Sequence, residues 1–334
     1  MAQTKIQFIL SIDTEEEWNW DGPFPGRDAQ VSNINELPAF HAFCQDLGIR
    51  PTYFTDYAVL DNPHSANIMK SLLAQNNCEI GAHLHPWVNP PFYGPVSEKE
   101  SHVVNLPIEQ VRAKLEALLV LMQDTLSLTP RAFRSGRWGI NGKCLDLLVE
   151  NGFAIDSSIY PFFRNEYFSC ECAPVTPYWP DLVDTNKAST TQRNIYEMPV
   201  TAGYNQKNFY LSHRLHNRLS NIPFSWFRLN GIFWHLGLLR KIYLSPELHN
   251  ADDMITLITT CLKRGQTLLH MYMHSSSLIE NVTGLSNACN ARESISETIT
   301  EVIEHLSKRH HVEFQTISEA SLVSNQTKNT RATR

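Results

Sequence analysis

The chain has 334 residues, of which 42% are hydrophobic and 19% charged, a balance typical of a soluble globular protein with one large or two modest domains. The formal net charge of -6 and the sequence pI of about 6.2 argue against a nucleic-acid partner and against a polybasic membrane-binding surface. Seven cysteines without two pairs at zinc-ribbon spacing indicate free thiols in a reducing compartment.

The first apolar stretch, residues 6–12, is too short for the hydrophobic region of a signal peptide and runs directly into acidic residues. No later apolar run approaches the roughly 20 residues that a membrane span needs. We therefore expect a cytoplasmic protein with no membrane span. Residues 324–334 are polar and end in basic residues, and we expect this tail to be disordered.

Short apolar segments alternate with helix-period segments along most of the chain. The segments that predict strands are residues 6–12, 51–57, 78–83, 131–136, 153–161, 194–200 and 265–275, with residues 312–320 closing the chain. The segments that predict helices are residues 33–48, 65–75, 106–128, 141–152, 252–264 and 295–309.

This alternation predicts an α/β fold with a parallel sheet. Seven or eight strands, with no dinucleotide-binding glycine motif after the first, favour a (β/α) barrel over a Rossmann sheet. Residues 162–250 are rich in aromatic residues, proline and histidine and have weaker periodicity. We interpret this region as an irregular insertion within a single barrel domain that covers residues 1–323.

Polar and ionisable residues follow nearly every predicted strand. Because the carboxyl ends of parallel strands meet at one end of a barrel, we expect these side chains to lie close together. In His83-Leu84-His85 the two imidazoles point to the same side of a strand. In chain order the strand-end residues are Asp13, Glu15, Asp56, His83, His85, Arg134, Arg137, Asp156, His270 and His274.

These residue types support one specific chemistry. Two neutral imidazoles and a carboxylate form an open site for Zn²⁺ or a similar divalent ion. A second carboxylate can act as general base beside the bound water, a further histidine can protonate the leaving group, and an arginine can keep the base ionised. The set describes metal-assisted hydrolysis of an acyl bond.

Each strand-end residue also has a purely structural interpretation. Asp13 and Glu15 begin an acidic run that could be a solvated turn, His270 could be a core histidine, and Arg137 could pair with a surface carboxylate. Four tryptophans beside the motifs could belong to the core or could stack on sugar rings. They are Trp18, Trp20, Trp87 and Trp138.

The order Asp-x-acidic, then "EIGAHLHPW", then "FRSG", then "HMYMHSSSL" resembles the polysaccharide deacetylase (NodB-homology) family of carbohydrate esterases. The resemblance covers residues 6–160 and 250–320, and two of its motifs look closest to a subgroup associated with cell-surface polysaccharide biosynthesis. It implies a distorted (β/α) barrel that uses a divalent metal to remove N- or O-acetyl groups from sugars. This chain differs from the usual family pattern in having its histidines two rather than four apart.

The resemblance also implies roles for individual residues. Asp13 would be the catalytic base, Arg134 would support it and His274 would be the general acid. Glu15, His83 and His85 would bind the metal, which we expect to be Zn²⁺, with Co²⁺, Ni²⁺ or Mn²⁺ as alternatives. Asp13 could instead be a ligand. The expected substrate contacts are Trp87, Arg137, Trp138, Asp56 and His270.

We therefore expect a hydrolase that acts on an acylated sugar precursor, with a metal-bound water as nucleophile. The alternatives are a deformylase or other non-sugar amide hydrolase, and a catalytically inactive sugar-binding protein on the same fold. The sequence leaves the particular substrate and the oligomeric state open.

Overall fold

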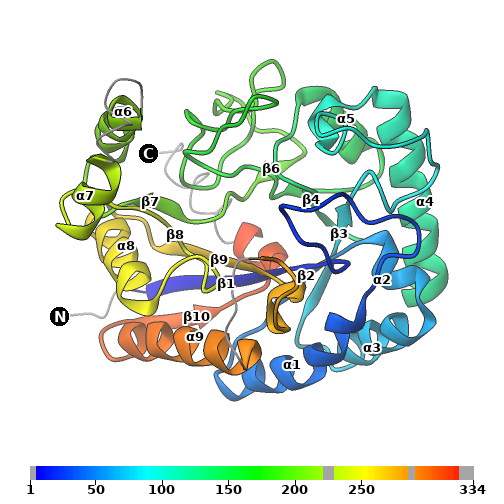
Figure 1. Cartoon of the computed structure of the whole chain (residues 1–334), viewed down its shortest axis with the longest axis horizontal. Helices are drawn as coiled ribbons and strands as arrows, with labels where there is room; N and C mark the ends of the chain where they lie inside the picture. The colour runs from blue at the N-terminus through cyan, green and yellow to red at the C-terminus, as the bar shows by residue number, and fades with distance from the viewer. Residues whose placement is uncertain (1–4, 221–228, 285–289, 323–334) are drawn as a thin grey trace.

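The computed structural model describes residues 5–220, 229–284 and 290–322, so the tail expected at residues 324–334 lies outside the described residues. An eight-stranded sheet occupies the centre of the molecule (Figure 1), and all of its strand pairs are parallel. Its strands are β1 (Lys5–Thr14), β2 (Thr52–Thr55), β3 (Glu79–Leu84), β4 (Ala132–Ser135), β5 (Ile155–Asp156), β6 (Tyr196–Glu197), β9 (Leu268–His274) and β10 (His311–Phe314).

Strand β1 organises the sheet because it pairs with three other strands. Its residues Lys5 to Phe8 pair with β10, Ser11 to Thr14 pair with β2, and Gln7 to Asp13 pair with β9. The apolar residues of β1 are buried, as expected for a strand covered on both faces.

The sheet curls back on itself after β6. The backbone N–H of Thr201 donates a hydrogen bond to the carbonyl oxygen of His270 at 2.9 Å, which joins the chain that leaves β6 to β9. The expectation of a distorted (β/α) barrel of seven or eight mostly parallel strands is confirmed.

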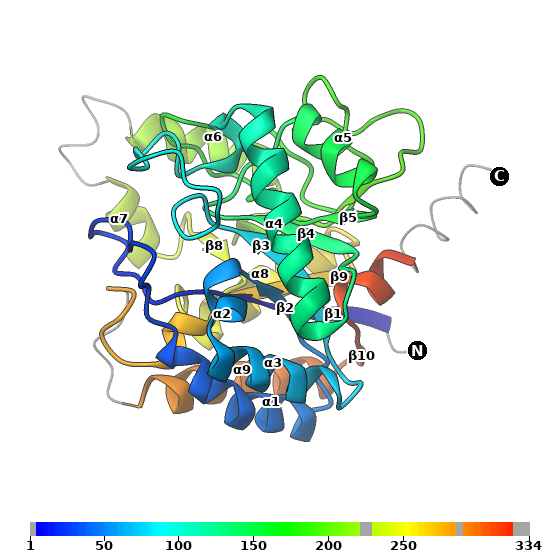
Figure 2. The same cartoon turned by 90° about the vertical axis from the view of Figure 1, so that its right-hand side faces the viewer.

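Helices pack around the sheet at the positions that the sequence predicts (Figures 1 and 2). They are α1 (Leu37–Asp46), α3 (Pro63–Leu73), α4 (Ile108–Leu126), α5 (Gly142–Glu150), α8 (Ala251–Lys263) and α9 (Ala291–Ser307). Short 3-10 helices occupy Ser32–Glu36, Val103–Asn105 and Ser275–Leu278. The first of them replaces the expected start of α1, because Pro38 fits the first turn of a regular helix and not its interior.

The sequence analysis did not predict α2 (Tyr57–Asp61). Asp56 caps this helix by accepting a hydrogen bond from the backbone N–H of Val59 at 2.9 Å. The Asp56 side chain therefore serves as the N-cap of a helix that begins directly after β2.

Region 162–250 is not wholly an excursion from the barrel, since it includes β6. The rest contains an antiparallel pair, β7 (Ala202–Tyr204) and β8 (Lys241–Tyr243), and two helices, α6 (Phe209–Ser220) and α7 (Leu229–His235). In Figure 1, α6 and α7 lie at the left edge of the molecule. No described helix is both long enough and apolar enough to cross a bilayer.

Candidate metal centre and acid–base pair

A cavity of about 260 Å³ opens at the carboxyl ends of the barrel strands. Nine of the residues singled out from strand ends and motifs line it: Asp13, Glu15, Trp18, Trp20, His83, His85, Arg137, Trp138 and His274. Its other walls come from His102, Tyr160, Phe163, Asn165, Glu247, Leu248 and Tyr272. The structure thus brings together side chains that are separated by more than 250 positions in the sequence.

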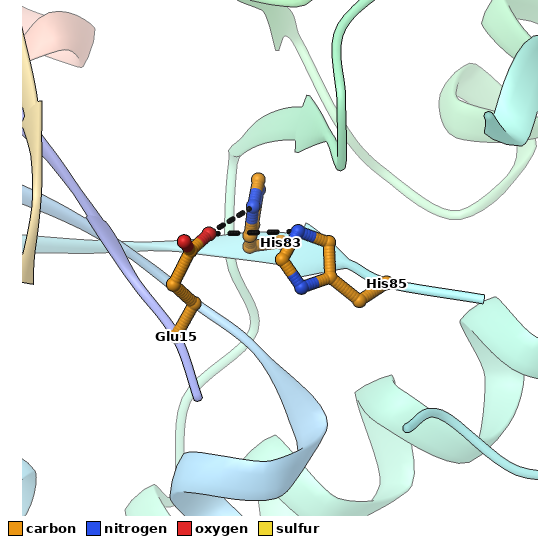
Figure 3. A group of neighbouring side chains, drawn as sticks. All are labelled: Glu15, His83 and His85. Atoms are coloured by element: carbon orange, nitrogen blue, oxygen red, sulfur yellow. Dashed lines mark ion pairs between the residues drawn. The ribbon is translucent and has the colours of Figure 1, made fainter. Parts of the chain in front are cut away.

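Glu15, His83 and His85 form one buried cluster (Figure 3). Oε2 of Glu15 lies 3.3 Å from Nε2 of His83 and 3.5 Å from Nε2 of His85. Both histidines come from the carboxyl end of β3, and they share one side of the strand as their spacing of two predicts.

Hydrogen bonds fix the tautomer of each imidazole. Nδ1 of His83 lies 2.9 Å from the carbonyl oxygen of Arg134, which can only accept, so Nδ1 carries the proton. Nδ1 of His85 lies 3.0 Å from the Glu16 carboxylate and donates to it. Each Nε2 therefore carries a lone pair that is directed at Glu15. Nε2 of His83 has no hydrogen-bond partner among the described residues.

Burial keeps both imidazoles neutral. It lowers the pKa of His83 to about 3 and the pKa of His85 to about 4, against the opposing effects of Asp13 and Asp56. Burial also raises the pKa of Glu15 well above its ordinary value, and the neighbouring Glu16 carboxylate adds to this shift. A cation at the centre of the cluster would oppose this shift and keep the Glu15 carboxylate ionised.

A divalent cation fits this set of donors. In a tetrahedral Zn²⁺ site with bonds of about 2.1 Å, neighbouring ligand atoms lie about 3.4 Å apart. The separations of 3.3 and 3.5 Å between Glu15 and the two histidines agree with that value. Neutral imidazoles with lone pairs directed inward, together with one carboxylate, are also ligands that divalent transition metals prefer.

Two other acid–histidine groups are less suited to a cation. In the group of Glu16, Asp56 and His85, the Glu16 carboxylate already accepts hydrogen bonds from His85 and from Nε1 of Trp87, the latter at 2.5 Å. In the group of Asp13, Glu15 and His274, Oδ1 of Asp13 is bonded to Arg134. Among these three groups of described residues, the cluster of Glu15, His83 and His85 is the one that offers two unprotonated imidazole nitrogens.

The main chain around Glu15 is clamped by side chains from two distant segments. Nδ2 of Asn33 donates to the carbonyl oxygen of Glu15 at 2.9 Å and to Oγ of Ser275 at 2.8 Å. Oγ of Ser275 accepts from the Glu15 backbone N–H at 3.1 Å. This fixes a carboxylate that lies just beyond the end of β1.

Arg134 holds Asp13 from below the cavity. Its side chain is fully buried, with Nη1 2.5 Å from Oδ1 of Asp13 and Nε 3.0 Å from the carbonyl oxygen of Ser157. Burial raises the pKa of Asp13, but Arg134, His83 and His274 together outweigh it, so that the pKa lies below its ordinary value. Asp13 is therefore ionised, with one oxygen bound to the guanidinium and the other facing His274.

His274 lies opposite Asp13, its partner in the register of β1 and β9. Nε2 of His274 is 3.7 Å from Oδ2 of Asp13, and Nδ1 is 2.6 Å from Oε1 of Glu247. Burial lowers the pKa of His274, but Glu247 and Asp13 overcome this effect and raise it. The imidazole is thus disposed to carry a proton and to present it at Nε2.

The sequence analysis missed Glu247 and Glu16. Glu247 lies in the irregular "SPELHN" segment (residues 245–250), where neither strand nor helix periodicity marks it. Its only signal is that it is the first acidic residue after Glu197. Glu16 lies in the acidic run that follows β1, and its neighbours Asp13 and Glu15 masked its separate role.

Three side chains that we expected to contact substrate lie away from the cavity wall. Asp56 caps α2, and Trp87 packs on the ring of His85 with 4.2 Å between ring centroids. His270 is fully buried beneath Arg134, with Nε2 2.9 Å from Oγ of Ser11. These three residues support the site from behind, which differs from the expectation, whereas Arg137 and Trp138 line the cavity.

No protein-family model matches the chain, and no curated protein matches its sequence. Among solved structures, one described as a polysaccharide deacetylase from Mycobacterium smegmatis is 14% identical, with a TM-score of 0.56 over 98% of this chain and 92% of that chain.

Two further structures have lower TM-scores. The Bc1960 peptidoglycan N-acetylglucosamine deacetylase is 11% identical, with a TM-score of 0.44 over 94% of this chain and 87% of that chain. A CE4 family pseudoenzyme from Bacillus anthracis is 10% identical, with a TM-score of 0.42 over 94% and 65%. Of these three structures, the one from Mycobacterium smegmatis is similar enough over nearly its whole length to identify the fold. The chain has the fold of the polysaccharide deacetylases, as its resemblance to that family implies.

Proposed function

We propose that the protein is a metal-dependent hydrolase that removes an N- or O-acetyl group from a sugar or polysaccharide precursor. The observation that carries this proposal is the inward-facing set of acceptor atoms on Glu15, His83 and His85, next to the pair of Asp13 and His274. A metal-dependent acyl hydrolase needs a cation, a base and an acid around one cavity, and these five residues supply the ligands, the base and the acid.

Glu15, His83 and His85 would hold the ion, which we expect to be Zn²⁺ or, in its place, Co²⁺, Ni²⁺ or Mn²⁺. When bound, such an ion polarises the acyl carbonyl group and acidifies water. Asp13 accepts the proton of the attacking water, and its bond to Arg134 favours this role over that of a ligand. His274 donates its Nε2 proton to the departing amine or alcohol, while Glu247 stabilises the imidazolium.

The remaining cavity wall suits a sugar. Trp18, Trp20, Trp138, Tyr160 and Tyr272 surround the reacting groups with aromatic surface. Sugar rings stack on such faces, and Trp138 is held in place by Tyr160, which stacks on it at 4.6 Å between centroids. We propose a cytoplasmic enzyme that acts on a precursor for cell-surface polysaccharide, in keeping with the subgroup that the motifs resemble.

Metal content tests the first part of the proposal. Protein purified without a histidine tag should contain about one divalent ion per chain, and His83→Ala and His85→Ala should each lose it. His102→Ala is the matched control, because His102 lines the same cavity outside the cluster. If the wild type binds no Zn²⁺ or Co²⁺ when either is supplied, the hydrolase proposal fails, and a non-catalytic sugar-binding protein takes its place.

Release of acetate from N-acetylated and O-acetylated oligosaccharides tests the second part. Asp13→Asn should bind the metal and lose about 10²–10⁴ in rate, which is the usual contribution of a general base. Release of formate from formylated sugars, with no release of acetate, would instead identify a deformylase.

A further inference from the structure

Large apolar side chains exposed at the surface are concentrated in one segment of the chain. Of the described residues with such side chains, four are dispersed over the molecule: Tyr93, Val120, Val183 and Leu322. The others are Tyr210, Leu211, Leu215, Ile232, Leu236, Leu238 and Leu248. All but Leu248 lie in residues 205–220 and 229–240, the described parts of the connection between β7 and β8, which we call the arm.

Helix α6 of the arm has two contrasting sides. Phe209, Ser212 and His213 are buried, whereas Leu211 and Leu215 are 62% and 42% exposed. Arg214 and Arg218 are also exposed, and with the two leucines they follow the i, i+3, i+4, i+7 spacing of a single helical stripe. One face of α6 therefore presents leucine and arginine side by side to solvent.

The charge of this region is of one sign. The sequence has no Asp or Glu between Glu197 and Glu247, although the whole chain has a net charge of -6. The basic residues of that stretch are Lys207, Arg214, Arg218, Arg228, Arg240 and Lys241. The overall charge, from which we expected no polybasic membrane surface, conceals this local excess.

The exposed basic side chains of the arm have no acidic partner in the described part of the chain. Lys207, Arg214 and Arg218 form no ion pair there. Glu171, which contacts α6, bonds to His213 and to Asn217 and leaves the arginine stripe unneutralised. Burial of this stripe against another surface therefore requires negative charge on that surface.

The arm is also close to the cavity. Trp234 of α7 stacks on His249 with 5.7 Å between ring centroids, next to Leu248. Leu248 both lines the cavity and is 37% exposed, so apolar surface extends from the arm toward the cavity.

We propose that the arm docks on the surface of an anionic phospholipid bilayer, with the α6 leucines in the acyl boundary and the arginines at the headgroup phosphates. Amphipathic helices that combine basic residues with leucine bind membranes in this way, without spanning them. A second copy of this chain is a poorer partner, because it would bring unpaired arginines against one another. Docking would bring the cavity near the bilayer, so the enzyme would act on an acylated sugar linked to a lipid anchor. This statement about the substrate rests on the proposed function.

Sedimentation with vesicles tests the docking without any assay of catalysis. Wild-type protein should sediment with vesicles of phosphatidylcholine and phosphatidylglycerol and stay in solution with phosphatidylcholine alone. Each arginine removed should weaken binding about fivefold, so Arg214→Gln with Arg218→Gln should cost about 25-fold. Leu211→Glu with Leu215→Glu should abolish sedimentation.

Matched controls are Val120→Glu, which charges an exposed residue of α4, and Arg131→Gln, which removes an exposed arginine outside the arm. Both should bind vesicles as the wild type does. The proposal is overturned if the wild type does not sediment with anionic vesicles, or if the arm variants bind these vesicles as tightly as the controls do. It is equally overturned if the arm mediates a dimer in solution that Leu211→Glu dissociates while vesicle binding is absent. If the wild type binds anionic vesicles but releases no acetate, the proposed function is refuted and the docking proposal stands.

Discussion

Nδ1 of His85 lies 3.0 Å from Oε2 of Glu16, and the other oxygen of that carboxylate, Oε1, accepts the indole N–H of Trp87. This bond leaves Nε2 of His85 as a lone pair directed at Glu15. Glu16 thus prepares a metal ligand without contacting the metal position itself.

We expect Glu16→Gln to weaken metal binding about 10–100-fold, the usual effect of removing the outer partner of a ligating histidine. Titration of the metal-free protein against a chelator would measure the change. Glu100→Gln is the control, since Glu100 is exposed, bonds to Ser97 and lies outside the cavity that holds the cluster. Equal affinities for the two variants would show that Glu16 has no part in preparing His85.

Gly136 makes room for the ring of His85. A Cβ atom at this position would lie 2.0 Å from Cδ2 of His85 and 2.6 Å from the carbonyl oxygen of Leu84. Gly136→Ala should therefore displace the ring, weaken metal binding and cost about 1–3 kcal/mol of unfolding free energy. In Gly26→Ala the new methyl group meets nothing within 4 Å, so metal content and urea midpoint should stay as in the wild type.

Arg134 neutralises a carboxylate that burial would otherwise penalise. Arg134→Met leaves Asp13 buried without its partner and should lower the unfolding free energy by about 3–5 kcal/mol. Adding Asp13→Asn should restore part of that loss, because the unpaired charge is gone. Denaturant unfolding of the single and double variants would test this, with Arg131→Met expected within about 0.5 kcal/mol of wild type. A double variant no more stable than Arg134→Met would contradict the charge-pair explanation.

Glu247 sets the pH range in which His274 can donate a proton. Since Glu247 raises the pKa of His274, kcat/KM should fall as the pH rises through that pKa and the imidazolium is lost. In Glu247→Gln the imidazolium loses its counter-charge, its pKa falls, and the decline of kcat/KM should move to lower pH. The pH profile of acetate release measures this shift. An unmoved alkaline limb would mean that another group is the acid.

Sequence pattern was sufficient for the barrel and for the centre of the site. The apolar run at residues 6–12 predicts the buried strand β1, and the spacing of two places His83 and His85 on one side of β3. The rule that carboxyl ends of parallel strands meet then brings Asp13 and His274 to the same cavity.

The alternation of side chains along a strand does not show how far from the cavity a given side chain lies. His270 and His274 share one side of β9, but His270 is four residues earlier and so lies about 13 Å deeper along the strand, beneath Arg134. Asp56 was likewise assigned to the cavity because the cap that it forms on α2 depends on a local turn that periodicity does not show. Glu247 was missed for the opposite reason, because tertiary contacts alone bring its irregular segment to His274.

The register of β1 with β9 has a consequence for biosynthesis. Asp13, Glu15, His83 and His85 all lie within the first 85 residues, whereas Glu247 and His274 follow more than 160 residues later. The ligands of the proposed metal are thus synthesised long before the acid, and a chain arrested ahead of β9 lacks its proton donor. Strand β1 must also wait for β9 and β10 before its pairing is complete, which makes the first strand made one of the last to be fully enclosed.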